Sequence, residues 1–203
     1  MPDVEPDGLE SPAAEVLETM GTTRAMRHFA PGPVPEWMIE RLVWAATRAP
    51  SPHNTQCWDF VVVTDAEVRA QVAQIFSAAA TRTTSAGAGM TARGLELMAN
   101  VAQAPVIVFV CGTNVYPPAA PDPVYMYSAV YAAAQNLVLA ARAMQLGATF
   151  TAFHRADEPA LRQLLAIPAD RTIAVTVPIG WPGRRFGPVR RRPLQEVLHR
   201  DRW

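Results

Sequence analysis

Apolar residues recur three and four positions apart in several stretches of the chain, which is the spacing of an amphipathic helix. The clearest stretch covers residues 34–48 and places five apolar side chains on one stripe: Met38, Ile39, Leu42, Val43 and Ala46. Further helices are predicted from Asp65, a favourable N-cap, to about residue 80, and over residues 95–101, 123–146 and 157–166. The helix over 123–146 is apolar on most faces, so we expect it to be buried and to end at Gly147 in the left-handed conformation.

Short runs rich in β-branched and aromatic residues predict strands at 59–64, 106–111, 149–153 and 172–179. No Gly-x-Gly-x-x-Gly motif follows any of these runs, so the sequence does not favour a Rossmann dinucleotide fold. The segment 77–94 is small, polar and glycine-bearing, and it predicts a mobile loop of the kind that often borders an active site.

Composition narrows the chemistry of the protein. Half of the 203 residues are apolar and 18% are charged, which suits one domain with a sizeable core and excludes wholesale disorder. The formal net charge is zero, which argues against a nucleic-acid partner. All eighteen basic residues are arginine, so Schiff-base chemistry and the Gly-Lys-Ser/Thr phosphate loop are excluded. Cys57, Cys111 and the four histidines lack zinc-ligand spacing, so we expect no metal and two reduced thiols.

Charge is unevenly distributed along the chain. Six of the first eighteen residues are acidic, whereas residues 184–202 contain seven arginines interrupted by prolines and apolar residues. We interpret residues 1–20 as an acidic N-terminal extension and residues 21–203 as a single domain, of which 183–203 forms an ordered C-terminal arm.

Nothing in the sequence is typical of a membrane or secreted protein. The nineteen uncharged residues between Asp122 and Arg142 are rich in alanine and include Gln135 and Asn136, which favours a buried helix over a membrane span. The N-terminus has neither the basic start nor the apolar run of a secretory signal. We therefore expect a cytoplasmic protein without a membrane partner.

Three groups of polar residues are candidates for a binding site. The first, TTRAMRHF at 22–29, carries Arg24 and Arg27 three residues apart, so that two guanidinium groups can bind one phosphate. The third, at 190–192, is an arginine cluster that suits the same ligand. The second, RAPSPHNTQCWDF at 48–60, is a proline-stiffened loop whose polar groups suit the edge of a heteroaromatic ring: Pro50, Ser51, Pro52, Asn54 and Gln56. Taken alone, each group is more typical of a solvated surface or a connecting loop.

The order of these groups resembles the FMN-dependent nitroreductase family. Arg-x-x-Arg-x-Phe is followed by an amphipathic helix and then by Ser-x-x-Asn-x-Gln-x-Trp before a strand. The later sequence agrees, with AAAQNLVLAARAMQLG, ATFTAFH, VPIGWP and RRRPLQEVL in that order. The resemblance runs over residues 22–203, and its most specific parts are the first two groups.

The resemblance implies an α+β fold in which helices flank a central, mostly antiparallel sheet, assembled as a domain-swapped homodimer. The long helix would pack against its twin, and the arm 183–203 would reach the other subunit. It further implies an oxidoreductase that takes hydride from NADH or NADPH. The expected reaction is ping-pong reduction of a flat electrophilic acceptor, such as a nitroaromatic compound, a quinone or an enone.

The resemblance also assigns residues to the cofactor FMN. Its phosphate would be held by the first and third groups: Arg24, Ala25, Arg27, Arg190 and Arg191. The loop with Pro50, Ser51, Pro52, Asn54 and Gln56 would line the flavin from the partner subunit. The run Thr149, Phe150, Thr151 and Ala152 would pass alongside the ring and supply a backbone N–H to its reactive nitrogen. No catalytic side chain is assigned, because the chemistry lies on the flavin; His154, Tyr125 and Tyr127 are candidate proton donors, and for His154 a structural role is favoured.

Two positions depart from the pattern of the family. Ala25 stands where the family often has Ser or Thr, so one hydroxyl contact to the phosphate is lost. Cys57 stands where Pro is common, and we interpret it as a packing residue.

Four alternatives stay open. Two are flavin destruction and reductive dehalogenation on the same fold, and the third is a non-catalytic flavin or deazaflavin module. In the fourth, no flavin binds and the arginines form an interaction surface. No motif in the sequence identifies the natural acceptor or distinguishes NADH from NADPH.

Overall fold

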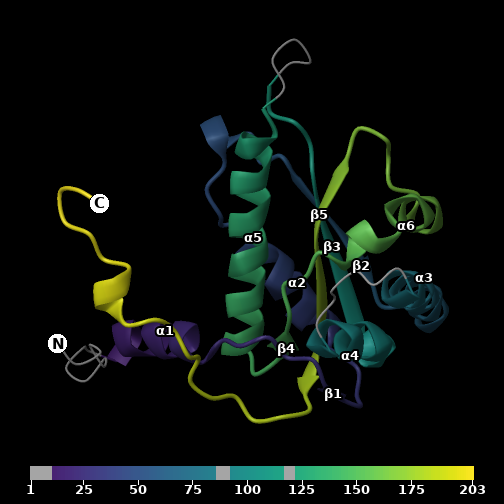
Figure 1. The fold of residues 1–203 in the computed structure, drawn as a ribbon, viewed down its shortest axis with the longest axis horizontal. Coiled ribbons are helices and arrows are strands. Elements are labelled where there is room, and N and C mark those ends of the chain that lie inside the picture. The colour runs from purple at the N-terminus through teal and green to yellow at the C-terminus, as the bar shows by residue number, and fades with distance from the viewer. Residues whose placement is uncertain (1–10, 86–91, 117–121) are drawn as a thin grey trace. The chain divides into compact units, whose positions relative to one another are not determined.

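A five-stranded antiparallel sheet forms the centre of the protein in the computed structural model, which describes residues 11–85, 92–116 and 122–203 (Figure 1). The strands are β1 (Phe29–Ala30), β2 (Trp58–Val63), β3 (Val106–Gly112), β4 (Gly147–Ala148) and β5 (Thr172–Pro182). They lie in the order β1-β5-β3-β2, and β4 also pairs with β5. The α+β fold with an antiparallel sheet is therefore confirmed.

Two layers of helices cover the sheet (Figure 1). One face is covered by α2 (Glu36–Ala46) and α5 (Pro123–Ala143), which pack against each other and, through α5, on β3 and β5. On the opposite side lie α3 (Ala66–Ser85), α4 (Ala92–Asn100) and α6 (Glu158–Leu165). Every residue of β3 is buried, because both faces of this central strand are covered.

The chain forms two compact units. The larger unit, Ala25–Arg185, contains the sheet and α2 to α6. The smaller unit joins Met1–Arg24 to Phe186–Trp203. In its described part, α1 (Ser11–Thr22) is linked to the C-terminal segment by a hydrogen bond from Val189 N–H to Gly21 O of 3.1 Å. The side chains of Val16, Leu17 and Met20 on α1 are exposed.

The long central helix ends differently from the prediction. Gln145, and not Gly147, adopts the left-handed conformation, with φ of 62°. The N–H groups of Gln145 and Leu146 bond to Arg142 O and Ala141 O, and Leu146 is fully buried, which together form a Schellman ending. Gly147 belongs to β4 instead, where a Cβ would lie 2.5 Å from Met26 Cγ. The glycine is required by close packing and not by the helix ending.

The prediction of a loop over 77–94 is wrong for the described part of that segment. Residues 77–85 continue α3, and residues 92–94 begin α4. Phe76 and Ala79 extend the buried stripe that begins at Val72, and the alanines at 78–80 have the highest helix propensity. Residues 86–91 lie outside the described residues.

The strand predicted at 149–153 is also replaced by a more irregular segment. Only β4, at Gly147–Ala148, is a regular strand, and Thr151 adds one isolated bridge to Thr176 of β5. The chain then enters a short 3-10 helix, η3 (Phe153–Ala156). The Oγ1 atoms of Thr149 and Thr151 donate to Met26 O and Thr176 O, so side-chain bonds to other segments help to hold this irregular stretch.

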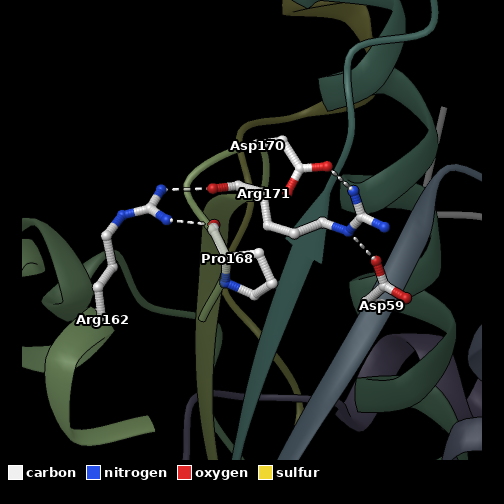
Figure 2. Close-up of polar contacts among 5 residues, drawn as sticks. All are labelled: Asp59, Arg162, Pro168, Asp170 and Arg171. Atoms are coloured by element: carbon white, nitrogen blue, oxygen red, sulfur yellow. Dashed lines mark hydrogen bonds and ion pairs between the residues drawn. The ribbon is translucent and has the colours of Figure 1, made fainter. Parts of the chain in front are cut away.

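The start of β5 is fixed by a network of arginines and carboxylates (Figure 2). Arg162 of α6 donates to Pro168 O at 2.9 Å and also to Arg171 O. Arg171 in turn donates to Asp59 on β2 at 2.7 Å and to Asp170 at 2.6 Å. The network thus connects α6, the turn before β5 and strand β2.

The capping and burial predictions agree well with the structure. Asp65 accepts hydrogen bonds from the N–H groups of Glu67 and Val68, both at 2.9 Å, and so caps α3 as expected. The stripe predicted on α2 is buried except for Val43, which is half-buried. None of the helices within the described residues is long and apolar enough to cross a membrane.

Candidate functional site

The loop between α2 and β2 has an unusual backbone conformation. His53, Asn54 and Gln56 have φ of 50°, 54° and 48°, in the left-handed region that costs non-glycine residues roughly 1–2 kcal/mol each. Two hydrogen bonds of 3.0 Å hold this shape, from Asn54 N–H to Ser51 O and from Gln56 N–H to Ser51 Oγ. Pro50, Asn54 and Gln56 are exposed, and Ser51 and Pro52 are half-buried. The loop therefore presents polar side chains on a fixed backbone.

The segment 149–152 runs along the edge of β5 with alternating orientation. The N–H groups of Thr149 and Thr151 donate to Pro178 O at 3.3 Å and to Thr176 O at 3.0 Å, and both threonines are buried. Phe150 and Ala152 are exposed, and within the described residues their N–H groups have no hydrogen-bond acceptor. The segment thus offers two free backbone donors on its outer side.

The first arginine group is attached to this segment. Met26 N–H donates to Ala148 O at 3.0 Å, and Thr149 Oγ1 donates to Met26 O. Arg27 is half-buried and directly follows Met26, which is hydrogen-bonded to Ala148 and Thr149 at the start of the 149–152 segment. Ala25, at the start of the larger unit, is exposed, and its methyl side chain offers no hydroxyl group to a ligand.

The remaining predicted arginines lie in the smaller unit. Arg24, Arg190 and Arg191 are exposed, and Arg191 Nη1 donates to Arg190 O at 3.0 Å. Among the residues that the structure describes, no carboxylate pairs with any of these three or with Arg27. All four guanidinium groups therefore keep the capacity to bind an anion.

Within one chain the loop at 50–56 and the Arg27 region lie at opposite ends of β5. Trp58 pairs with Gly112, which pairs with Thr172 at the start of β5. Ala148 pairs with Ile179, seven residues further along that strand. At 3.3 Å per residue this separation is about 23 Å along the strand. The structure brings Arg27 and the start of the 149–152 segment together in the larger unit, and the 50–56 loop lies toward the other end of β5.

Comparison with known proteins identifies the family. The model of the nitroreductase family matches residues 21–181, which is most of the chain. The protein belongs to the nitroreductase family.

Individual relatives of this nitroreductase-family chain carry several names. A putative NADH dehydrogenase/NAD(P)H nitroreductase of Archaeoglobus fulgidus is 27% identical over 194 residues, covering 93% of this chain and 99% of the relative. A 5,6-dimethylbenzimidazole synthase of Rhodobacter capsulatus is 32% identical over 175 residues, covering 82% and 83%. An iodotyrosine deiodinase of Danio rerio is 24% identical over 190 residues, covering 88% and 64%.

A solved structure supports the same assignment. A putative nitroreductase in complex with FMN, from Desulfovibrio desulfuricans, matches with a TM-score of 0.71 and 27% identity. The match covers 96% of this chain and 99% of the other. The family, and with it the nitroreductase fold, is shown over nearly the whole length of the chain.

Among the candidate proton donors, His154 has the environment of a structural residue. It is only 3% exposed, and its Nδ1 lies 3.2 Å from Thr176 Oγ1. Burial lowers the pKa of His154 from 6.5 to about 4, so the imidazole is neutral near pH 7. A neutral buried ring supports the structural role that the sequence favours. Nothing in the sequence predicted that Thr176 would be the partner of His154.

The tyrosines form ring contacts that sequence analysis did not anticipate. Tyr127 and Tyr131 lie one helical turn apart on α5, with ring centroids 5.2 Å apart. Tyr131 contacts Phe150 edge-to-face at 5.7 Å, and Tyr125 contacts Tyr116 at 4.7 Å. The spacing of Tyr127 and Tyr131 is the only trace of this cluster in the sequence, since Phe150 comes from another element.

Both cysteines are free thiols. Cys57 is half-buried in the loop before β2, and Cys111 is buried in β3. Burial raises the pKa of the Cys111 thiol to about 11, so this group stays protonated. In the described ranges, no group of His, Cys, Asp and Glu side chains is arranged to hold a metal ion.

The lowered pKa of His154 predicts a pH-dependent stability. Between pH 6.5 and about pH 4, the unfolded chain binds a proton at this position and the folded chain does not. The free energy of unfolding should therefore fall by roughly 3 kcal/mol as the pH drops through this window, and the contribution is complete above pH 6.5. His154→Gln keeps a hydrogen-bonding group but cannot titrate, so its urea-unfolding free energy should fall less. The exposed His199→Gln variant is the control, and equal pH slopes for all three proteins would contradict the prediction.

Proposed function

We propose that this protein is an FMN-dependent oxidoreductase that takes hydride from NAD(P)H and reduces a flat electrophilic acceptor. The observation that carries the proposal is the pair of free backbone donors at Phe150 and Ala152, beside the Arg27 region, in a chain of the nitroreductase family. The FMN bound by the related D. desulfuricans protein supports the choice of cofactor.

The residues present fit a flavin mononucleotide. Its phosphate is a dianion, and four arginines without carboxylate partners among the described residues suit it: Arg24, Arg27, Arg190 and Arg191. The polar edge of its ring needs donors, which Phe150 N–H and Ala152 N–H offer. Ala25 removes a hydroxyl from the phosphate site, but its backbone N–H remains as a donor.

When bound, FMN would carry two electrons, a role that no side chain of this protein can take. The role of this chain is to bind and to stabilise charge. The free N–H groups would stabilise negative charge that develops at the ring edge, and the arginines would anchor the phosphate. Each turnover takes a hydride from NAD(P)H, and the acceptor receives that hydride equivalent and a proton from solvent. Both substrates use one slot, so the oxidised nicotinamide leaves before the acceptor binds.

Two subunits would complete each site. The registers of Trp58, which follows the 50–56 loop, and of Ala148, which Met26 contacts, differ by about 23 Å along β5, and this offset favours contacts of one flavin with Arg27 of one chain and the loop of the other. We assign the Pro50, Ser51, Pro52, Asn54 and Gln56 contacts to the partner subunit, and the arm 183–203 to a swapped position on that subunit.

The helix α5 offers a surface for the twofold contact. Most of its apolar residues are buried within one chain against the sheet and α2, so its apolar composition alone does not require a dimer. Its outer face carries Ser128, Ala132, Gln135 and Leu139 at helical spacing, all exposed or half-buried. This stripe has no charge and only one large apolar side chain, so two copies of the helix can approach closely across a twofold axis.

A second function on the same fold has some support. The R. capsulatus relative is named 5,6-dimethylbenzimidazole synthase, and the D. rerio relative is an iodotyrosine deiodinase. Flavin destruction or reductive dehalogenation would use the same flavin site. A non-catalytic flavin module would keep the same residues but would not react with reduced nicotinamide. The experiment that follows separates these functions.

The cofactor prediction is that the protein purifies yellow with FMN. Denaturation should release FMN and not FAD, because the arginines suit one terminal phosphate. NADH or NADPH should bleach the visible spectrum under anaerobic conditions, and menadione should restore it. Flavin that disappears on exposure to oxygen would support the destruction reaction, and a coloured protein that neither nicotinamide bleaches would support the non-catalytic module. A colourless protein that FMN does not reconstitute would contradict the proposal.

The arginine prediction separates a phosphate clamp from a solvated tail. Removal of one charge-assisted pair should cost about 1.5–3 kcal/mol, so Arg191→Ala and Arg24→Ala should each weaken FMN binding roughly ten- to hundredfold. Arg191→Lys should recover only part of the affinity, because an ammonium group cannot make a forked contact. Arg184→Ala, at an exposed position of the larger unit, is the control. Fluorescence titration of the apoprotein measures all four, and equal affinities for Arg191→Ala and Arg184→Ala would refute the clamp.

The dimer prediction is tested on α5. Gln135→Arg should weaken the dimer at least a hundredfold, because an unpaired charge buried in an interface costs about 3 kcal/mol or more. Flavin content should fall with the loss of the dimer, since each site needs both chains. Gln163→Arg, at another exposed glutamine, on α6, should leave the dimer intact. Light scattering at micromolar concentration measures the mass, and a wild-type monomer that holds flavin would rule the dimer out.

A further inference from the structure

A cavity lies in the larger unit at the end of the sheet where β2 stops and β3 begins. Its volume is about 360 Å³, and it is lined by the loop between β1 and α2, the first turn of α3 and the segment that leads into β3. Thr64 and Val106 place it beside these strand ends, because Val63 and Ile107 are paired in the β2–β3 ladder. Segments that are far apart in the sequence therefore build one cavity.

This cavity is separate from the proposed flavin site. Val106 pairs with Ile179 on one edge of β5, whereas Ala148 pairs with the same residue on the other edge. The segment 149–152 continues from Ala148, so strand β5 lies between it and the cavity. The 50–56 loop precedes β2, whereas the cavity lies where β2 ends.

The walls of the cavity are apolar and stiff. Val34 and Val106 are buried. Pro33 and Pro105 stand beside them in the chain, and proline has a fixed φ. Trp181 Nε1–H donates to Pro33 O at 3.0 Å and so ties the β1–α2 loop to β5. The cavity is therefore largely pre-formed, as ligand pockets usually are.

Arg69 supplies the only charge among the described residues that line the cavity. It is half-buried, and three backbone carbonyl groups orient its guanidinium group. Nε donates to Thr64 O at 3.2 Å, and Nη1 donates to Ala102 O at 3.3 Å and to Ala104 O at 3.1 Å. Within the described residues, Nη2 has no hydrogen-bond acceptor and no carboxylate pairs with Arg69. Two N–H groups of a fixed cation are thus left for a ligand.

The carbonyl contacts explain the position of Arg69 but not its charge. A carbonyl group orients a guanidinium group without neutralising it. A charge that is partly removed from water is more stable when an opposite charge lies beside it. The unpaired charge of Arg69 next to apolar walls therefore favours an anionic ligand.

The charge and the size of the cavity define that ligand. One guanidinium group matches one negative charge, and arginine binds the planar carboxylate group well. Apolar walls suit a hydrocarbon body and not a hydrated inorganic anion. Ligand pockets range over about 300–1,000 Å³, so a cavity of about 360 Å³ suits a compact molecule and not a dinucleotide or a peptide.

From this arrangement we infer that the cavity is a binding site for a small organic monocarboxylate. The carboxylate group bonds to Arg69, and the apolar body lies against Pro33 and Val34. The exposed polar residues Thr64 and Gln103 complete the lining. The inference does not rest on the proposed function, because none of these residues is assigned to the flavin.

Binding of cyclohexanecarboxylate to the protein as purified tests the inference at pH 7, where this ligand is ionised. Its ring is not aromatic, so it does not stack on a flavin. The indole N–H of Trp181 reports on the cavity in ¹H–¹⁵N spectra, because it bonds to Pro33 in the cavity wall. Trp181→Phe identifies its signal among the five tryptophans. This signal should shift in a saturable way, and the indole signal of exposed Trp44 should not.

Variants of the lining connect the shift to the cavity. Arg69→Gln keeps a polar side chain but removes the charge, so the Kd should rise roughly ten- to hundredfold. Thr64→Tyr narrows the cavity and leaves Arg69 in place, so it should also weaken binding. Arg184→Gln, at an exposed arginine of the same unit, is the matched control and should bind as the wild type does.

A neutral ligand isolates the contribution of the charge. Cyclohexanecarboxamide has nearly the same shape as the carboxylate but no charge, so it should bind the wild type at least about tenfold more weakly. The change Arg69→Gln should alter the Kd of the amide far less than that of the carboxylate. Because this comparison uses the wild type, it decides the question even if Arg69→Gln does not fold.

The outcomes separate this inference from the proposed function. The inference would be overturned by an unshifted Trp181 signal, by equal binding of carboxylate and amide, or by carboxylate affinities in Arg69→Gln and Thr64→Tyr that equal that of the wild type. FMN content should stay unchanged in both variants. A wild-type protein that binds no FMN would overturn the proposed function, whereas carboxylate binding at Arg69 would still stand.

Discussion

Both edges of strand β5 are used, and the candidate site depends on this double pairing. One edge carries the long ladder to β3, and β4 and Thr151 pair with β5 as well. Buried residues that are bonded to β5 therefore alternate with exposed residues along the 149–152 segment. The N–H groups of Thr149 and Thr151 donate hydrogen bonds to β5. Within the described residues, the N–H groups of Phe150 and Ala152 have no acceptor. The same alternation that leaves the donors unpaired also turns the Phe150 ring outward.

The turn at Met26 connects this segment to Arg27. Met26 is bonded to Ala148 O through its N–H and to Thr149 Oγ1 through its carbonyl oxygen. Its side chain fills the space that a Cβ at Gly147 would need. Arg27 is therefore positioned by backbone contacts and close packing, and it needs no ion pair of its own for its placement. A change at Gly147 would move the arginine and the free donors together.

Several polar groups inside the larger unit are tied into its packing by hydrogen bonds or burial. His154 is buried, neutral and bonded to Thr176, and the Cys111 thiol stays protonated in the fully covered strand β3. Arg162 and Arg171 join α6, β5 and β2 through carbonyl and carboxylate contacts (Figure 2). The His154 imidazole and the Cys111 thiol are thus buried and uncharged near pH 7, whereas the exposed segment carries backbone donors and the Phe150 ring. That distribution suits a protein whose redox chemistry belongs to a bound cofactor.

Local signals in the sequence by itself determined most of the helices, whereas the family and the antiparallel α+β fold followed from the resemblance of its motifs to the nitroreductase family. Helical periodicity predicted α2 and α5, and Asp65 marked the start of α3. The positions assigned to the flavin followed from a resemblance, and their contacts stay predictions.

What only the tertiary structure decided depended on contacts between distant residues. The role of Gly147 came from Met26, more than a hundred residues away, and the helix at 77–85 came from the burial of Phe76 and Ala79. The irregular path at 149–153 followed from threonine hydroxyls that bond to other segments. The ring contact between Tyr131 and Phe150 joins α5 to the segment that follows β4, and no local pattern in the sequence predicts it. Local propensity fixes which element forms, whereas packing fixes where it stops and which side chains it leaves exposed.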